Sequence, residues 1–496
     1  MQTFQTIFVI VYFCILCIVS VYGIHRFAMS TLYRIHRKDI PKPDDEFTDL
    51  PRVTIQLPMF NEKYVVERLV DAVCQIRYPR EKLQIQVLDD STDETQEIAK
   101  AAVDKKAAEG FDIVYIHREN RSGYKAGALE AGLKTATGEF VGVFDSDFIP
   151  QPDFLEHTVH FFTNEKVGMV QVRWEHLNRE FNILTRAQSI LLDGHFVIEH
   201  TARNRSGRFF NFNGTAGIWR KSTIADAGGW QHDTITEDLD LSYRAQSKGW
   251  QFIYINEQTA PAEIPVEMIA FKTQQHRWAK GSIQVAKKIL PNLLKSKLPF
   301  KIKTEAWMHL TSNINYILMV ILSLIMPLTV EFRVRNSWMT SLWVDLLMFI
   351  CATFSVLSFY YLAQKEARKQ SFLRRLAYLP VVMALGIGLN INNTRAVTEA
   401  LVGYKTGFVR TPKYGVQKGG ESIKHVKYGF KLNWQPWVET AIGVYFVWGI
   451  YNAAMQGAWA SIPFLLLFCV GYLYVGLGTF LGRTGLFSRQ KVDQVA

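Results

Sequence analysis

Long apolar runs lie near both ends of the chain, and a stretch that mixes charged and apolar residues lies between them. Residues 6–23 are almost wholly apolar and are about long enough to cross a bilayer as a helix. Similar runs lie at about 308–330, 340–363, 437–455 and 460–481, whereas residues 50–300 have the mixed pattern of a globular domain. The pattern predicts a soluble domain embedded between transmembrane helices.

The mixed stretch alternates strand-like and helix-like segments. Buried strands are expected at 53–57, 84–88, 113–116 and 140–144, and helices at 64–75, 92–109 and 123–135. This alternation is typical of a mostly parallel sheet in a Rossmann-like α/β domain. Ligands bind at the carboxyl ends of strands in such sheets. The residues that follow the predicted strand ends are therefore candidate ligand-binding residues: Glu62, Asp89, Asp90, Asp145 and Asp147.

One further apolar segment, at about 376–394, is harder to place. Its apolar core, residues 379–385, is short, and the glycines and asparagines that follow are costly in lipid. If this segment were a sixth span, the many Lys and Arg of residues 405–431 would lie outside the cell, against the positive-inside bias. We therefore expect five spans and one interfacial segment, with six spans as the alternative.

The formal net charge of +11 comes with Lys and Arg that cluster beside the apolar runs. This clustering fits the positive-inside bias and contact with membrane lipids, and no nucleic-acid motif accompanies it, so nucleic acid is not an expected partner. The basic residues that follow residue 23 place the next part of the chain in the cytoplasm. We expect a multi-pass protein of the inner or plasma membrane, with a transmembrane helix over 1–24, a cytoplasmic linker over 25–50, a cytoplasmic catalytic-type α/β domain over 51–295 and a membrane region over 296–496.

Several side chains in the mixed stretch suit the chemistry of a sugar nucleotide. Asp145 and Asp147 point to the same side of an extended segment, and their carboxylates suit Mg²⁺ or Mn²⁺. Lys125 stands at a Gly-flanked helix start, where phosphate can bind, although a solvated helix lysine is an equal alternative. Trp278 offers a flat apolar face to a sugar ring, or else packs in the core.

The motifs also occur in an order that resembles a known family. The segments that carry the likeness are Ile85–Asp93, Gly123–Gly127, Asp145–Asp147, Phe212–Gly217, Thr236–Asp238 and Gln274–Trp278. The chain resembles the family 2 inverting glycosyltransferases from Val53 to about Lys288. It is similar to their processive branch, which contains cellulose, hyaluronan and plant cellulose-synthase-like enzymes, and especially to the plant mannan and xyloglucan-backbone synthases. The resemblance implies a GT-A fold for the α/β domain.

The resemblance also implies a role for each matching residue. Asp238 corresponds to the catalytic base that deprotonates the acceptor hydroxyl, and Asp145 and Asp147 correspond to the metal site. The positions implied to bind the nucleotide sugar are Pro58, Glu62, Asp90, Lys125, Asp145, Gln274 and Arg277. The positions implied to bind the acceptor are Asn213, Gly214, Thr215, Glu237 and Trp278. Asp89 is the weaker candidate of its pair.

A second, shorter likeness lies in the membrane region at about 404–415. Phe408, Thr411 and Lys413 match the gating loop of bacterial cellulose synthase, whereas Arg410 does not. A mobile basic loop of this kind would close over the diphosphate and exclude water. A basic loop that faces lipid is the alternative interpretation.

The favoured function is a processive, metal-dependent transferase that polymerises a β-glucan from UDP-glucose, uses Mg²⁺ or Mn²⁺, and moves the growing glycan across the membrane. Three alternatives stay open: a β-mannan or glucomannan synthase that uses GDP-mannose, a non-processive ceramide-type lipid glucosyltransferase, and a non-catalytic conduit or scaffold subunit. The expected partners are the nucleotide sugar, the growing glycan acceptor and membrane lipids, and accessory export proteins are possible partners as well.

Overall fold

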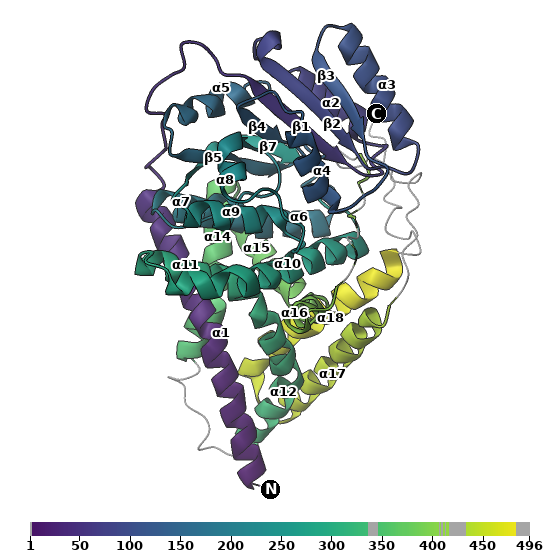
Figure 1. The fold of residues 1–496 in the computed structure, drawn as a ribbon. Coiled ribbons are helices and arrows are strands. Elements are labelled where there is room, and N and C mark those ends of the chain that lie inside the picture. The colour runs from purple at the N-terminus through teal and green to yellow at the C-terminus, as the bar shows by residue number, and fades with distance from the viewer. Residues whose placement is uncertain are drawn as a thin grey trace.

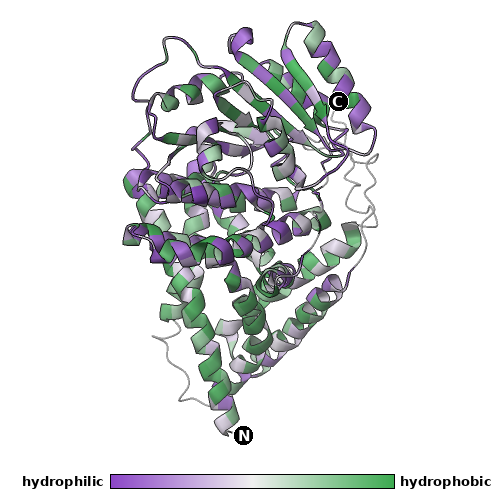
Figure 2. Cartoon of the chain, in the orientation of Figure 1, coloured by the Kyte–Doolittle hydropathy of each residue, from purple (hydrophilic) through white to green (hydrophobic). Residues whose placement is uncertain are grey.

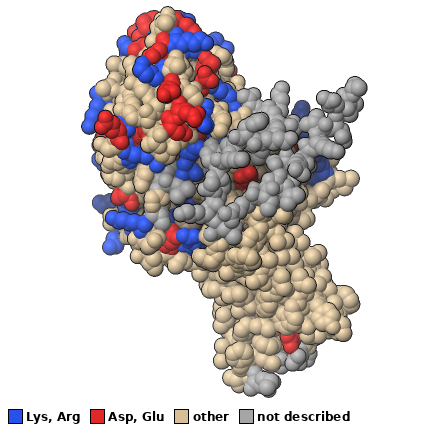
Figure 3. All heavy atoms as spheres, turned by 90° about the vertical axis from the view of Figure 1, so that its right-hand side faces the viewer, with Lys and Arg blue, Asp and Glu red and all other residues tan. Residues whose placement is uncertain are grey.

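The structure, a computed structural model, divides into a polar half and an apolar half (Figure 1). It describes residues 2–335, 346–405, 407, 410, 411, 413–415 and 433–482. Hydrophilic and hydrophobic residues mix in the upper half, whereas long hydrophobic helices form the lower half (Figure 2). In the side view of Figure 3, Lys, Arg, Asp and Glu crowd the surface of the upper half and are nearly absent from the lower half. The division shows which part of the chain is apolar enough for a bilayer, and the predicted domain bounds stay a prediction.

The upper half is an α/β domain built on one mixed sheet. Its strands are β1 (Val53–Met59), β2 (Leu83–Asp89), β3 (Asp112–His117), β4 (Phe140–Val143), β5 (Val167–His176), β6 (Gly217–Arg220) and β7 (Gln251–Ala262). Its helices are α2 (Val66–Cys74), α3 (Thr95–Ala108), α4 (Tyr124–Leu133), α5 (Phe154–Thr158), α6 (Ile183–Asp193), α7 (Thr201–Arg205), α8 (Lys221–Asp226) and α9 (Glu237–Ser247), with a π-helix, η3 (Gly194–His200), between α6 and α7.

The strand order in the sheet is β3-β2-β1-β4-β6-β5-β7. Neighbours β1 to β4 run parallel, and β6 runs antiparallel to both β4 and β5. The strands β1, β2 and β4 are buried along their whole length, and the polar side chains of β1 and β2 bond to each other, as Thr54 does to Gln84 and Gln56 to Gln86. The predicted mostly parallel α/β fold is therefore confirmed, and its first four strands and three helices form within a few residues of their predicted bounds.

The strand β1 extends past its predicted end at residue 57 and includes Pro58. Pro58 pairs with Leu88 of β2, whereas the pairing of β1 with β4 ends at Gln56. The missing N–H of a proline costs a ladder hydrogen bond only where a neighbouring strand would accept it. The strand can therefore run through Pro58 because one of its sides is already unpaired there.

The remaining helices form the lower half and its boundary with the catalytic-type domain. They are α1 (Gln2–His36), α10 (Met268–Lys295), α11 (Phe300–Thr311), α12 (Asn315–Arg335), α14 (Ser355–Ala367), α15 (Phe372–Gly388), α16 (Asn390–Val402), α17 (Gln435–Met455) and α18 (Ile462–Gly482). Among the described residues, four helical stretches are long and apolar enough to cross a membrane: 3–36, 300–334, 346–367 and 459–481. The start of the predicted span at 340–363 lies outside the described residues.

The helices α15 and α16 cover the segment predicted to be interfacial. Together these two helices are long and apolar enough to cross a membrane, but they are bent by 43° at the break between them. Their asparagines are buried in protein, and the Nδ2 of Asn392 donates a hydrogen bond to the carbonyl of Lys272 in α10 at 2.9 Å. These polar side chains therefore avoid the cost in lipid that the sequence suggested. Helix α17 forms over the predicted span 437–455 but is not among the four stretches, so the number of crossings stays a prediction.

Candidate active site

The predicted carboxylates gather at one edge of the sheet. Because β1, β2 and β4 run parallel, their carboxyl ends meet at the same edge, and Glu62, Asp90 and Asp145 follow these three strands. Asp89 is different, because its carboxylate accepts hydrogen bonds from the backbone N–H of Ser91 and the hydroxyl of Tyr115. Asp89 therefore stabilises the turn after β2.

Lys125 joins the Asp145–Asp147 motif to the predicted acceptor motif. Its ammonium forms an ion pair with Asp145 and donates a hydrogen bond to the carbonyl of Gly214 at 2.8 Å. Burial would lower the pKa of Lys125, but the neighbouring carboxylates, Asp145 first, raise it, so the ammonium stays charged. The backbone N–H of Asp145 also donates to the hydroxyl of Thr215 at 2.9 Å.

Gly214 is required at its position for two reasons. Its φ is +80°, a conformation that L side chains rarely adopt. A Cβ there would also lie 3.0 Å from Oδ2 of Asp238 and 3.4 Å from Nζ of Lys125. The acceptor motif therefore approaches the predicted base more closely than any residue with a side chain would allow.

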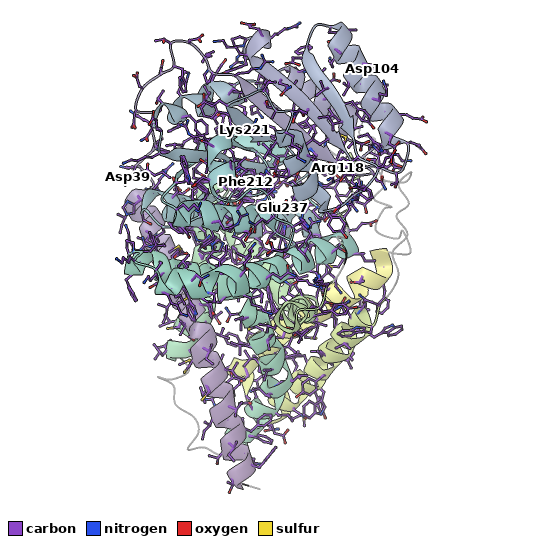
Figure 4. The ribbon with its side chains drawn as sticks, viewed as in Figure 1. Asp39, Asp104, Arg118, Phe212, Lys221 and Glu237 are labelled. Carbon is purple, nitrogen blue, oxygen red and sulfur yellow. The ribbon has the colours of Figure 1, made fainter. Side chains whose placement is uncertain are left out.

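Asp238 lies in the first turn of α9, with its carboxylate on a large cavity. Burial, together with the negative charge of Glu237, raises its pKa to about 7, while Lys125 acts in the opposite direction. Burial also raises the pKa of Glu237. A carboxyl group poised near neutral pH is suited to accept a proton from a hydroxyl. Figure 4 shows Phe212 and Glu237 near each other in the catalytic domain, directly above the layer of α10.

The predicted Q-x-x-R-W motif lies on α10. Gln274 and Trp278, four residues apart, share one face of the helix and line the same cavity as Asp238 and Asn213. Arg277 is half-buried, and the loss of water around its guanidinium lowers its pKa, although four carboxylates, Asp145 the strongest, act in the opposite direction. The motif therefore places a cation at the carboxylate cluster and an aromatic ring on the cavity wall.

Asp147 contacts the segment that resembles a gating loop. One carboxylate oxygen of Asp147 forms an ion pair with Lys413, and the other, Oδ1, is buried without a hydrogen-bond partner among the described residues. The hydroxyl of Thr411 lies 3.4 Å from the guanidinium of Arg277. Two of the three predicted loop residues therefore lie against the site, and Phe408 lies outside the described residues.

Three residues that the sequence interpretation missed complete the site. Arg118, which follows β3, binds both carboxylate oxygens of Asp90, with its Nε 2.7 Å from Oδ1. Arg410 lies 3.2 Å from Glu62, and burial raises the pKa of Glu62 to about 7 despite that arginine. Glu263 accepts hydrogen bonds at 2.8 and 2.9 Å from the backbone N–H groups of Tyr414 and Gly415.

Of these three residues, only Arg118 could have been found by the strand-end argument that identified the predicted carboxylates, because it follows a strand end in the same sheet. Figure 4 shows it at the side of the domain where β1, β2 and β3 end. Arg410 had been set aside as a mismatch in the loop motif.

The cavity below Asp238 has a volume of about 950 Å³. Asn213, Asp238 and Trp278 line it at the catalytic domain, and residues of α12 and α18 such as Met326 and Phe468 line it within the hydrophobic half. Asn213 is oriented at its wall by His200, whose Nε2 lies 2.7 Å from its Oδ1. One space thus connects the candidate base to the predicted membrane helices.

Comparisons with known proteins agree with this geometry. A family model described as "Glycosyltransferase like family 2" matches residues 51–281. Glucomannan 4-beta-mannosyltransferase 1 of Oryza sativa subsp. japonica is 40% identical over 287 residues, which cover 56% of this chain and 54% of that protein, so this alignment spans about half the length of the relative. Probable glucomannan 4-beta-mannosyltransferase 3 of Arabidopsis thaliana is 33% identical over 480 residues, which cover 90% of this chain and 82% of that protein.

Among solved structures, a mannosyltransferase from Pyrobaculum calidifontis in complex with GDP-Man and Mn²⁺ superposes with a TM-score of 0.53. It is 18% identical and covers 79% of this chain and all of that chain, which supports the fold. The family match over the catalytic domain and the near full-length similarity to the Arabidopsis protein together identify the chain as a hexosyltransferase that belongs to the cellulose-synthase-like branch of the family 2 glycosyltransferases.

Proposed function

We propose that the protein transfers mannosyl units from GDP-mannose to the end of a growing β-linked glycan, and that the product passes into the cavity below Asp238. The observation that carries this proposal is the cavity of about 950 Å³, which begins at the candidate base and continues between the membrane helices. A space of this size suits several sugar rings in file. The names of both relatives support mannosyl transfer, and hence GDP-mannose over the UDP-glucose that the sequence favoured.

In this proposal Asp238 acts as the base. Its carboxylate takes the proton from an acceptor hydroxyl while that oxygen attacks the anomeric carbon of the donor. The new glycosidic bond forms as the bond between the anomeric carbon and the diphosphate breaks, and GDP leaves with the electron pair. Attack from the face opposite to the leaving group inverts the configuration, so an α-linked donor yields a β-linked product.

Cationic side chains surround the expected position of the diphosphate. Lys125 and Arg277 lie among the carboxylates, and Lys413 lies at Asp147. Positive groups held in place favour charge that develops on a leaving group. We assign Lys125, Arg277 and Lys413 to this role, with Glu62, Asp90 and their arginine partners toward the nucleoside.

Asp145 and Asp147 fit a divalent metal ion. The buried, unpartnered Oδ1 of Asp147 is an oxygen of the type that Mg²⁺ and Mn²⁺ bind, and the diphosphate would supply further oxygens. When bound, such an ion neutralises the charge of the leaving diphosphate. No cluster of three or more His, Cys, Asp or Glu side chains suited to a metal occurs within the described part of the chain, which fits an ion shared with the substrate.

Product analysis tests this proposal. Purified protein in detergent is incubated with Mg²⁺ or Mn²⁺ and labelled GDP-mannose or UDP-glucose in separate reactions. We expect a high-molecular-weight product from GDP-mannose that β-mannanase digests, and none from an Asp238→Asn variant. A polymer that forms only from UDP-glucose and that β-glucanase digests would show that the donor is UDP-glucose and not GDP-mannose. A short chloroform-soluble product without polymer would contradict glycan elongation and favour the lipid glycosyltransferase.

A further inference from the structure

A small hollow lies where the catalytic domain meets the membrane helices, apart from the active site. It is formed by the start of α6, the end of α14 and the first turns of α15, which pack against one another. Its volume is about 20 Å³, and none of its lining residues lines the large cavity. The residues on which the argument rests are Glu180, Arg186, Arg368, Arg374 and Tyr378, which we call the arginine hollow.

The arginine hollow has more positive than negative charge. Glu180 is shared by Arg186 at 2.8 Å, Arg374 at 3.6 Å and Arg368 at 3.7 Å. The neighbouring Arg179 does not change this balance, because both oxygens of Asp193 already bind it, at 2.7 and 2.8 Å. Three guanidinium groups therefore face one carboxylate, which leaves a net positive charge that favours an anion.

The side-chain N–H groups of two of these arginines remain available to bind a ligand. The side chains of Arg368 and Arg374 make no hydrogen bond to any residue that the structure describes, and their distances to Glu180 exceed that of a hydrogen bond. They are 42% and 49% exposed, so an outside ligand can reach them. A planar guanidinium matches the geometry of phosphate oxygens, which it binds through two N–H groups.

The size of the hollow limits the ligand. A volume of about 20 Å³ is close to the space that one water molecule needs. The oxygens of a phosphate group can enter such a hollow, whereas a nucleoside or a sugar ring cannot. A nucleotide sugar is therefore a poor candidate, although the catalytic domain that borders the hollow uses one.

Exposed apolar residues lie in the first turns of the same helix, mostly on the side away from Arg374. Phe372, Leu373 and Leu376 of α15 are 57%, 76% and 40% exposed, and Arg374 lies among them in sequence. Helix α15 is the first half of the bent pair that is apolar enough to cross a membrane. Basic residues next to exposed apolar residues at a membrane boundary suit a lipid, because headgroup and acyl chain are both recognised.

We propose that the arginine hollow binds the phosphate of an anionic phospholipid in the leaflet next to the catalytic domain. Arg368 and Arg374 hold the phosphate oxygens, Arg186 contributes charge from the catalytic domain, and the acyl chains extend toward the apolar part of α15. The lipid would thereby join α6 to α15, and so the catalytic domain to the membrane helices.

Lipid titration of the full-length protein in detergent tests this site, with native mass spectrometry to count bound lipid. Phosphatidylglycerol and phosphatidylcholine are compared for the wild type and for Arg368→Gln/Arg374→Gln. We expect the double variant to bind phosphatidylglycerol on the order of tenfold more weakly, because it loses two basic residues at the headgroup. Equal phosphatidylglycerol binding by the two proteins would overturn the proposal.

Two further variants separate a binding defect from a folding defect. The matched control Arg52→Gln/Arg77→Gln also removes two exposed, paired arginines, but from the catalytic domain. It should bind like the wild type, and an equal loss in it would assign the effect to net charge. Glu180→Gln removes the competing carboxylate and should tighten binding, which misfolding would not do.

Inorganic phosphate distinguishes a lipid from a free anion. Thermal unfolding is followed with phosphatidylglycerol or with inorganic phosphate at the same concentration. Stabilisation by the lipid that depends on Arg368 and Arg374 supports the proposal. Equal stabilisation by inorganic phosphate would show that the hollow binds a free anion and would reject the lipid.

Discussion

At the scale of single residues, the reactive centre depends on the balance of charges around Asp238. Its pKa of about 7 results from burial and from Glu237, which raise it, and from Lys125, which lowers it. The motif predicted a catalytic role for Asp238, but it did not predict this balance of charges. It depends on Lys125, which is 113 residues earlier in the chain and reaches the site only through the fold.

We expect the rise of kcat/KM with pH on the acid side to reflect the ionisation of the Asp238 carboxyl group. Asp238 accepts a proton only when ionised, so kcat/KM should rise with pH up to about 7 and then level off. Glu237→Gln removes a neighbouring negative charge and should shift the midpoint to lower pH. Lys125→Gln removes a positive charge and should shift it to higher pH. Initial rates measured from about pH 5 to about pH 9 test both shifts.

The control for this experiment is Asp104→Asn, which removes an exposed carboxylate of α3 at the far side of the domain (Figure 4). Its midpoint should equal that of the wild type. Shifts of Glu237→Gln and Lys125→Gln in the same direction would contradict the assignment of this ionisation to Asp238.

The residues of the site that could be predicted are those placed by local sequence. Glu62, Asp90 and Asp145 follow strands whose apolar runs are evident, so their shared edge follows from a parallel sheet. Arg410 could not be predicted in this way, because its partner Glu62 is 348 residues away. Glu263 was missed for a similar reason, since its carboxylate binds backbone of residues 414 and 415.

At the scale of elements, the loop segment over 410–415 competes with a cation at Asp147. The ammonium of Lys413 pairs with the carboxylate that we assign to the metal. Removing this ammonium in Lys413→Met should therefore tighten Mn²⁺ binding to the donor-free protein, roughly three- to tenfold, since a partly buried ion pair is lost. Mn²⁺ titration followed by electron paramagnetic resonance measures this change.

Lys405→Met is the matched control, because Lys405 is exposed in the same connection and precedes the loop residues that contact the site. It should leave Mn²⁺ affinity unchanged. Weaker Mn²⁺ binding in Lys413→Met would mean that the lysine supports the metal site instead of competing for it.

The helix of the Q-x-x-R-W motif is held in the membrane region by a buried ion pair. Lys272 of α10 lies 2.7 and 2.8 Å from the two carboxylate oxygens of Glu439 in α17. Lys272→Met leaves a buried carboxylate without its partner and should destabilise the protein by about 3–5 kcal/mol. The double variant Lys272→Met/Glu439→Gln should recover most of this loss. Thermal unfolding in detergent compares the variants.

Equal stability of the single and double variants would contradict a coupled pair. The exposed pair Lys100 and Asp104 in α3 is the control, because Lys100→Met should cost no more than about 1 kcal/mol.

Elements were predictable where their pattern is regular and local. The parallel strands β1 to β4 and the helices between them are strand-like and helix-like segments that alternate along the chain, so this local pattern was sufficient. The antiparallel β6, with four residues, and the π-helix η3 were not predicted, because short or irregular elements depend on contacts far along the chain. The bend between α15 and α16 was hidden for the same reason, since one of its asparagines, Asn392, binds the backbone of α10, which is far away in the sequence.

At the scale of the whole molecule, the division into a charged half and an apolar half leaves the charged half outside the bilayer (Figure 3). From the positive-inside bias we predict that this half faces the cytoplasm. A cysteine introduced by Asp104→Cys, in a chain whose own five cysteines are serine, should react with a membrane-impermeant maleimide only in permeabilised cells. A cysteine introduced by Thr3→Cys, at the end of α1 that lies away from the catalytic domain, should react in intact cells. Labelling of residue 104 in intact cells would reverse the orientation.

The loop that lies over the carboxylates also affects how the protein is made. Chains are synthesised from the N-terminus, and domains fold as they emerge. Asp90, Asp147 and Asp238 are therefore complete long before Arg410 and Lys413, which follow most of the membrane helices. Until those helices are inserted, the domain on the ribosome has its carboxylates but neither the loop residues nor the walls of the cavity. A half-made chain therefore lacks both the loop residues and the cavity walls of the proposed site, so we expect sugar transfer to begin only after the membrane helices have been added.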